Sequence, residues 1–196
     1  AGITINTDNF TLNGSAYTNG VFGATAQYPN INGTVTDIDD ITDEDNTEGE
    51  ETEDVFDVSC DMILIHTKLA DKYFTENCDT YDEDYTYSDM NVNINDPIYV
   101  TGRLNLDGNI SLNDAVGAVS DVDLTGGNLN GNNTVIYSKF GDIDISNSQA
   151  TVNGLIYAPF GTVTIDCDNF NMNGLIIAQN VVIDGYGANI NLSLIH

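Results

Sequence analysis

Basic residues are nearly missing from this chain. Lysine and arginine together number 4, against 31 aspartates and glutamates, so the formal net charge at pH 7 is -27. Nucleic acids and anionic membrane surfaces attract proteins through positive side chains, and we therefore exclude both as partners. Cations and positively charged surfaces remain compatible with this balance.

Long apolar runs are missing as well. No stretch approaches the roughly 20 apolar residues that a membrane-spanning helix needs, so we expect no membrane insertion. The first ten residues, AGITINTDNF, lack the basic region and the apolar core of an export signal. The chain begins at Ala1 without methionine, as an exported protein would after removal of its signal.

Cysteine is scarce and occurs as Cys60, Cys78 and Cys167. Cys60 and Cys78 are near enough in sequence for a local disulfide in an oxidising compartment, and two free thiols are the alternative. Cys167 stands where a related segment near the N-terminus has Thr7, which predicts a small side chain at a turn. No C-x-x-C pair or neighbouring histidine accompanies it, so we expect no metal or redox role.

Repetition is the most prominent feature of the chain. Residues 136–155 (IYSKFGDIDISNSQATVNGL) and residues 156–175 (IYAPFGTVTIDCDNFNMNGL) read as two copies of one phrase. A further copy near the N-terminus, residues 3–14 (ITINTDNFTLNG), matches residues 163–174 (VTIDCDNFNMNG). Apolar pairs continue the pattern at intervals of 18 to 21 residues, as Leu104/Leu106, Val122/Leu124, Ile143/Ile145 and Val163/Ile165, with Ile183 after them.

Each copy contains three short stretches of alternating apolar residues, separated by Asn, Asp, Gly or Ser. Alternation with period two predicts short strands with one face inward, and the separating residues tolerate the left-handed backbone of tight corners. The sequence therefore predicts an all-β fold, a right-handed parallel β-helix (β-solenoid) with three-strand coils of 18 to 21 residues. In one copy the inward residues would be Val163/Ile165, Phe170/Met172 and Leu175/Ile177.

The repeat divides the chain into N-terminal solenoid strands (residues 1–29), an acidic insertion (30–90) and parallel β-helix coils (91–196). Stacked coils place equivalent turn residues above one another, so side-chain amides can form hydrogen-bonded ladders. Asn153 and Asn173, each followed by glycine, are the clearest candidates, and Asn13 would join them.

The insertion begins with a strongly acidic run. Residues 37–57 hold twelve acidic side chains and no basic one, which predicts a solvated surface loop. Asp37, Asp39, Asp43 and Asp45 are oxygen ligands at alternating spacing and are candidate calcium ligands, although the EF-hand frame is not met. No other cofactor is expected.

Helical spacing occurs in residues 58–74 (VSCDMILIHTKLADKYF) and predicts one short amphipathic α-helix. We expect this helix to cover an open end of the solenoid or to lie along one face, with His66 as an ordinary helix residue. Residues 80–89, which are rich in tyrosine, are interpreted as the return to the first full coil, with a binding surface as the alternative. The apolar residues at helical spacing are Met62, Ile65, Leu69 and Tyr73.

The C-terminal half contains phrases such as NGLIYAPFGTVTI and NGLIIAQNVVIDG. In these it resembles the right-handed β-helix segments of large secreted and cell-surface proteins of clostridia-like bacteria. In architecture alone it also resembles the bactofilins, which are polymer-forming β-helical proteins. The first resemblance implies an extracellular location and a noncatalytic role, and the second implies end-to-end polymerisation. The acidic insertion departs from both.

Right-handed β-helices include polysaccharide lyases and hydrolases, which use clustered carboxylates or a cationic base. Asp142 and Asp144 should stack in register with Asp121 and Asp123, but their alternation with inward apolar residues favours a solvated face. Arg103 is the single arginine, and a chain of charge -27 repels polyanionic sugars. No nucleophile elbow, P-loop, zinc spacing or dinucleotide fingerprint occurs, so we expect no enzyme and no catalytic residue.

A carbohydrate-binding or adhesive module of a larger cell-surface protein is a second function that suits this fold. Tyr137 and Tyr157 fall in register one coil apart, and they are candidates for an aromatic stripe that contacts cell-wall or host glycans. Their alternation with Ile136 and Ile156 leaves packing at a corner as the alternative.

The sequence favours a structural, self-assembling protein. Both ends of the chain read as coil sequence without a capping helix, and an uncapped coil exposes unpaired backbone donors and acceptors. Pairing of the C-terminal coil with the N-terminal strand of another copy does not close and would give an extracellular filament. A segment cut from a longer protein would show the same ends. The candidate subunit contacts are Ile3, Ile5, Phe10, Leu12, Ile190, Leu192 and Leu194.

Overall fold

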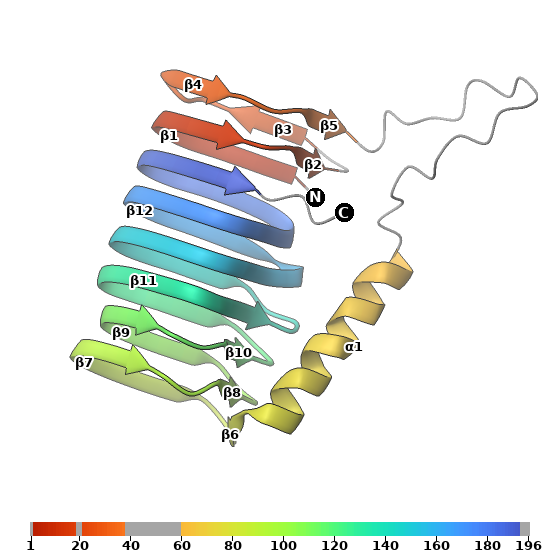
Figure 1. Cartoon of the computed structure of the whole chain (residues 1–196), viewed down its shortest axis with the longest axis vertical. Coiled ribbons are helices and arrows are strands. Elements are labelled where there is room, and N and C mark those ends of the chain that lie inside the picture. Colours follow the sequence, from red (N-terminus) through yellow and green to blue (C-terminus); the bar gives the residue numbers. More distant parts are fainter. Residues whose placement is uncertain (1, 19–20, 38–59, 193–196) are drawn as a thin grey trace, which may run out of the picture.

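The computed structural model describes residues 2–18, 21–37 and 60–192. They form a stack of short strands with one helix beside it (Figure 1). In chain order the elements are β1 (Gly2–Asn13), β2 (Ala16–Thr18), β3 (Val21–Ala24), β4 (Tyr28–Ile31), β5 (Val35–Asp37), α1 (Cys60–Asn77), β6 (Asp79–Tyr81), β7 (Tyr85–Ile94), β8 (Ile98–Val100), β9 (Leu104–Leu112), β10 (Val116–Ala118), β11 (Val122–Ser138) and β12 (Ile143–Leu192).

The strands pair in parallel with their equivalents in the neighbouring coils. β11 pairs with β12 so that Val122 lies beside Ile143, and β9 pairs with β11 so that Leu104 lies beside Val122. These are the apolar positions whose spacing predicted the coils. The mostly-β architecture and the parallel β-solenoid are therefore confirmed.

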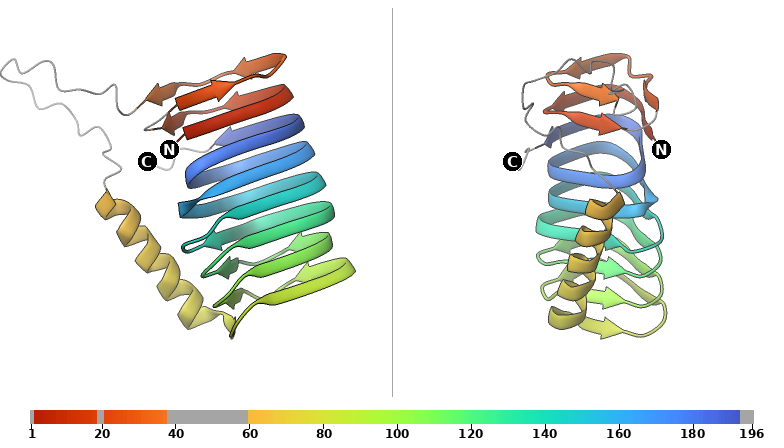
Figure 2. Two further views of the ribbon diagram at one scale, coloured as in Figure 1. Left: turned by 180° about the vertical axis from the view of Figure 1, so that it is seen from behind. Right: turned by 90° about the vertical axis from the view of Figure 1, so that its right-hand side faces the viewer.

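Each coil contributes strands to three faces of the stack. The first face contains residues 104–106 and their equivalents, the second contains residues 110–112, and the third contains residues 98–100. Helix α1 lies over the third face, as the side view in Figure 2 shows. Within the described residues, no helix is long and apolar enough to cross a lipid bilayer.

The order of the stack differs from the order of the chain. β1 pairs with the last turn of β12, from Gly2 beside Asn180 to Asn13 beside Asn191. β3 and β4 pair with the other side of β1, while β6 and β7 lie at the opposite end against β8 and β9 (Figure 1). The chain therefore starts inside the stack, and internal segments form its two ends.

Coil structure extends into the predicted insertion from both sides. β4 and β5 continue the N-terminal coils to Asp37, beyond the predicted limit at residue 29. β6 and β7 start the first coil after the helix, so the tyrosine-rich residues 80–89 are the predicted return to the coil pattern. Only the acidic run and the helix lie between these coils in sequence.

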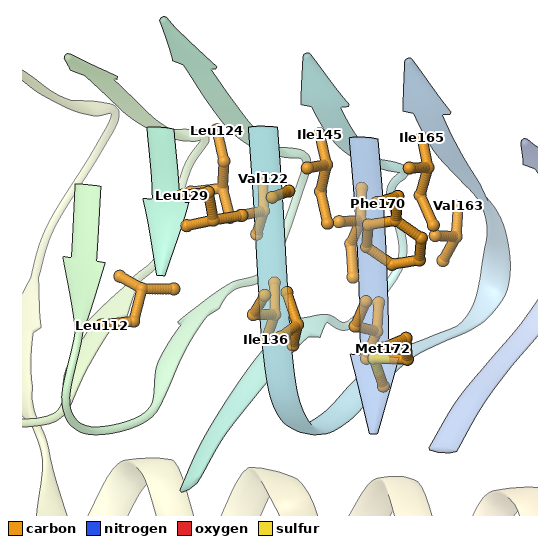
Figure 3. Close-up of a cluster of buried hydrophobic side chains, with 14 of the residues drawn as sticks. Leu112, Val122, Leu124, Leu129, Ile136, Ile145, Val163, Ile165, Phe170 and Met172 are labelled. Atoms are coloured by element: carbon orange, nitrogen blue, oxygen red, sulfur yellow. The ribbon is translucent and has the colours of Figure 1, made fainter. Parts of the chain in front are cut away.

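The core consists of the inward side chains of successive coils, several of which are drawn in Figure 3. Val163, Ile165 and Met172 have no exposed surface, and burial of each such side chain contributes about 1.5–3 kcal/mol. On the third strand the predicted inward residues are wrong: Ile176 packs against this core, whereas Ile177 lies beneath the helix. This strand is apolar on both sides because α1 covers its outer side.

Helix α1 confirms the predicted helix, with bounds at Cys60 and Asn77 instead of 58 and 74. Its Phe74 is buried between Tyr99 and Tyr137, with 5.3 Å between ring centroids on either side. The Asp71 carboxylate accepts a hydrogen bond of 3.0 Å from the Tyr137 hydroxyl and pairs with Lys139 at 2.6 Å. An aromatic contact bordered by a polar one therefore fixes the helix to the third face.

Candidate functional site

At each end of the solenoid, the outermost described strands have a neighbour on one side only. β3 and β4 pair with β1, and β6 and β7 pair with β8 and β9. In a strand, successive backbone N–H and C=O groups point to alternate sides, so each of these strands presents unpaired groups outward. We call residues 21–36 the neutral end coil and residues 79–96 the acidic end coil.

The apolar core is open at both end coils. Tyr81 and Tyr87 occupy inward positions of the acidic end coil, in register with the buried Val100 and Leu106, yet they are 37% and 38% exposed. Ile31 occupies an inward position of the neutral end coil and is 38% exposed. Side chains that are buried inside the stack therefore face solvent at its ends. Val21, Tyr28 and Met90 add exposed apolar surface there.

The two ends differ in charge. Residues 21–36 contain no charged residue, and Asp37 at the end of β5 is the first carboxylate of the acidic run. Two acidic end coils brought together would set like charges against one another, which is unfavourable, whereas a neutral end coil against an acidic one would not. The acidic end coil has no basic residue and carries the carboxylates of Asp79, Asp82, Glu83, Asp84, Asp89 and Asp96.

A column of asparagines follows one corner of the stack. The side-chain nitrogen Nδ2 of Asn173 donates to Oδ1 of Asn153 at 2.8 Å, and Asn191 donates to Asn173 at 2.9 Å. Asn13 donates to Asn191 at 2.7 Å, so the column continues from the last turn of β12 to β1. The asparagine ladder predicted for Asn153, Asn173 and Asn13 is confirmed.

The asparagine bonds share one direction, and bonds of the same kind lie at both ends of the stack. In each bond the asparagine nearer the neutral end coil donates Nδ2 to Oδ1 of the asparagine nearer the acidic end coil. Asn32 donates to Asn13 at 2.9 Å, and Asn113 donates to Asn95 at 2.9 Å. The stack therefore ends in the acceptor Oδ1 of Asn32 on one side and in the donor Nδ2 of Asn95 on the other.

The structure corrects the predicted subunit contact, because the pairing is formed within one chain. Ile5 lies beside Ile183, and Leu12 lies beside Ile190, in the parallel pair of β1 with β12. A strand with the alternation of a coil can pair with any equivalent free edge. An edge in the same chain has a higher effective concentration than an edge in another copy, so pairing within the chain is favoured. Ile3, Ile5, Phe10, Leu12 and Ile190 thus belong to the internal stack, and the side chain of Leu192 and all of Leu194 lie outside the described residues.

The structure also corrects the predicted glycan stripe. Tyr137 is fully buried, Tyr157 is 3% exposed, and their rings stack at 5.7 Å beneath α1. Burial raises the pKa of the Tyr137 hydroxyl, and the charge of Asp71 raises it further. These tyrosines have no surface to offer a sugar, and they pack beneath α1 on the third face instead of at a corner.

The disulfide predicted between Cys60 and Cys78 does not form, and Cys78 is a free thiol. These residues stand at opposite ends of an 18-residue helix, which spans about 27 Å, whereas bridged cysteines have Cα atoms about 4.4–6.8 Å apart. Cys167 is buried at a corner and free, and burial raises the pKa of its thiol to about 11. It is the small side chain that the sequence predicted.

The stacked aspartates of the first face are engaged in structural contacts. Asp121 Oδ1 accepts from the backbone N–H of Asp142 at 3.0 Å, and Asp142 Oδ1 accepts from Thr162 at 2.7 Å. The Arg103 guanidinium bonds to Asp121 and holds its pKa below the usual range, while partial burial raises the pKa of Asp123. These carboxylates close the corners of successive coils.

Of the four candidate calcium ligands, one lies within the described residues. Asp37 is the last residue of β5, and Asp39, Asp43 and Asp45 lie outside the described residues. In the described part of the chain, no group of three or more histidines, cysteines and acidic residues is arranged to hold a metal ion.

Sequence reasoning missed an exposed pair of aromatic rings. Phe140 and Phe160 are 61% and 46% exposed, and their rings stack at 6.1 Å across adjacent coils. The Lys139 ammonium lies 5.1 Å from the Phe140 ring centroid. Both phenylalanines precede a corner glycine, in SKFGD and APFGT, and this position in the phrase is the signal that could have identified them.

An apolar groove of about 230 Å³ separates α1 from part of the third face. Ala70 and Phe74 line it from the helix, and Leu155 and Ile177 line it from the sheet. Tyr73, Val135 and Tyr157 complete its lining. Comparison with protein-family models, with curated proteins and with solved structures finds no match to this chain.

Proposed function

We propose that this protein is a noncatalytic, extracellular structural protein of the cell surface, which assembles with copies of itself head to tail into a filament or fibre. The observation that carries the proposal is the pair of open end coils, each with outward backbone groups and exposed core side chains. Stacking of one copy on the next would satisfy these groups and bury these side chains.

The shape of the stack supports this proposal. Successive coils keep one register, from β7 beside β9 to β1 beside β3 and β4, so a second copy can continue the same parallel pairing. Both end coils are formed by segments inside the chain, and each offers strands of the same kind as those paired within it. Such a contact joins two different surfaces and therefore repeats without closing.

Resemblance supports the location and the mode of assembly. The phrases that resemble those of surface proteins of clostridia-like bacteria favour a secreted protein, and the resemblance in architecture to bactofilins favours polymerisation. The composition agrees with a role outside nucleic-acid binding, because only 4 residues are basic. Calcium would serve as a counter-ion for the acidic run, residues 37–57, and no cofactor takes part.

Salt is expected to control assembly. Each copy carries a net charge of -27, so repulsion between copies opposes stacking until ions screen it. The Debye length falls from about 30 Å at 0.01 M salt to about 8 Å at 0.15 M. Negative-stain microscopy and light scattering should therefore show few filaments at low salt and longer ones at physiological salt or with calcium. Monodisperse particles at every salt, calcium and protein concentration would contradict the proposal.

A carbohydrate-binding module is the second candidate, and the stacked pair Phe140–Phe160 is the observation that favours it. Exposed aromatic faces offer apolar contact to sugar rings, and two rings on adjacent coils form a short platform. If this is the function, Phe140→Ala with Phe160→Ala should abolish retention on cell-wall glycan columns. Tyr186→Ala is the matched control, because Tyr186 is 60% exposed and lies outside the pair. Equal retention of both variants would remove this candidate.

A further inference from the structure

We infer that the next copy continues the asparagine ladder across the contact between subunits, with Nδ2 of Asn95 donating to Oδ1 of Asn32 in the preceding copy. The inference rests on the proposed self-assembly and specifies its polarity and register. The neutral end coil of one copy contacts the acidic end coil of the next. Asn32 and Asn95 are the residues that select this arrangement.

The direction of the ladder is the first argument. Each described bond runs from Nδ2 of an asparagine to Oδ1 of its neighbour on the acidic side. A copy added to the neutral end coil in the same orientation places Asn95 above Asn32, with a donor facing an acceptor. Two neutral end coils facing each other would instead oppose two Asn32 oxygens, and two acidic end coils would oppose two Asn95 donors.

The distribution of charge is the second argument. The contact of two acidic end coils would set six carboxylates against six. The inferred contact sets these carboxylates against residues 21–36, which carry no charge, with Asp37 as the one carboxylate of β5. Like charges across an interface exclude wrong orientations more than they strengthen the right one, so the charge pattern selects polarity.

The register of the inward side chains is the third argument. Phe22 lies beside Ile3, and Tyr85 lies beside Leu104, in the same inward column of the first face. Aligning Asn95 with Asn32 therefore places Tyr85 of the added copy over Phe22. In the second face it places Ile94 over Ile31. The exposed core side chains of the two ends then cover one another, with aromatic rings adjacent.

Cysteine cross-linking tests this register directly. Gly23 and Thr86 are the outward residues of one column at the two ends, and a side chain at Gly23 would meet no atom within 4 Å. In-register residues of neighbouring strands lie about 4.8 Å apart, which suits a disulfide. Gly23→Cys and Thr86→Cys are made singly in a protein carrying Cys60→Ser and Cys78→Ser, with the buried Cys167 retained.

Under assembly conditions, an oxidised mixture of the Gly23→Cys protein and the Thr86→Cys protein should give mixed dimers, and each protein alone should give none. The double variant should give a series of covalent multimers. Dimers of the Gly23→Cys protein alone, or of the Thr86→Cys protein alone, would overturn the inference. Filaments visible by microscopy without mixed dimers would overturn the register and leave the proposed function standing. Absence of both filaments and cross-links would overturn the proposed function and the inferred register together.

Alanine replacement tests the interfacial hydrogen bond in the full chain. Asn95→Ala removes the inferred interfacial bond together with the bond that Asn95 accepts from Asn113 in its own copy. The critical concentration for assembly should therefore rise at least roughly fivefold, the factor that corresponds to loss of one hydrogen bond. The matched control is Asn93→Ala, because Asn93 is exposed on the same end coil outside the ladder, and its critical concentration should not change. An unchanged value for Asn95→Ala, or equal shifts for both variants, would overturn the assignment of Asn95.

Discussion

Replacing Gly174 by alanine is expected to lower the free energy of unfolding by about 3 kcal/mol or more. Gly174 follows Asn173 at the ladder corner and has a φ of +148°, a conformation that side chains of L-residues rarely adopt. A Cβ atom there would lie 1.9 Å from the carbonyl oxygen of Gly154 in the preceding coil. The added atom meets backbone, and backbone at a paired corner cannot move without breaking the stack.

Gly23→Ala is the matched control for this prediction. Gly23 also lies in a coil, but a Cβ atom there would meet nothing within 4 Å. Denaturant unfolding followed by circular dichroism should show a lower midpoint for Gly174→Ala and a nearly unchanged one for Gly23→Ala. Equal midpoints would show that the corner relaxes and that close approach of the coils is not required there.

The features that the sequence predicted well depend on local chemistry repeated in each coil. Alternation such as that of Val163 and Ile165 requires an inward face, and the interval between copies sets the length of a coil. Asn-Gly at residues 173–174 supplies both the amide for a ladder and the backbone for a corner. Repetition reinforced each of these signals, so the solenoid and the ladder could both be predicted from the sequence.

The order of the coils could not be predicted in the same way. Residues 3–14 match residues 163–174 because every coil needs the same alternation, and this likeness does not distinguish one free edge from another. The prediction therefore paired the N-terminal strand with another molecule, whereas β1 pairs with the last turn of β12 in the same chain. The open ends of the stack are therefore residues 21–36 and 79–96, which the prediction had placed partly in the insertion and partly in the flanking coils.

The third face shows where the tyrosine prediction failed. Phrases such as LIYA, residues 155–158, are apolar at successive positions, which is typical of a strand covered on both sides. Tyr137 and Tyr157 point outward from the core, as alternation with Ile136 and Ile156 predicted, but α1 covers that outer side. The apolar run and the predicted helix, considered together, could have indicated that the helix packs on the outer side of this strand.

Replacing Phe74 by alanine is expected to detach α1 from the third face. Truncation of a buried phenylalanine costs about 3–5 kcal/mol, and an isolated helix of this length is only marginally stable in water. Besides the partly buried Ala70, the bond from Tyr137 to Asp71 and the pair of Asp71 with Lys139 hold the helix there, and both polar contacts are partly exposed. Hydrogen exchange should therefore accelerate in α1 while β11 and β12 keep their protection, because the solenoid core forms a separate cluster.

The same variant should change the titration of Tyr137. Its pKa is raised by burial and by Asp71, so loss of the helix should return the pKa toward the ordinary value of about 10, as measured by tyrosine absorbance. Leu69→Ala is the control within the helix, because Leu69 is 59% exposed and its truncation should change stability by less than about 0.5 kcal/mol. If Phe74→Ala leaves both the exchange of α1 and the pKa of Tyr137 unchanged, the aromatic stack does not hold the helix. Detachment of α1 in Phe74→Ala but not in Leu69→Ala would show that the Phe74 side chain couples the helix to the solenoid.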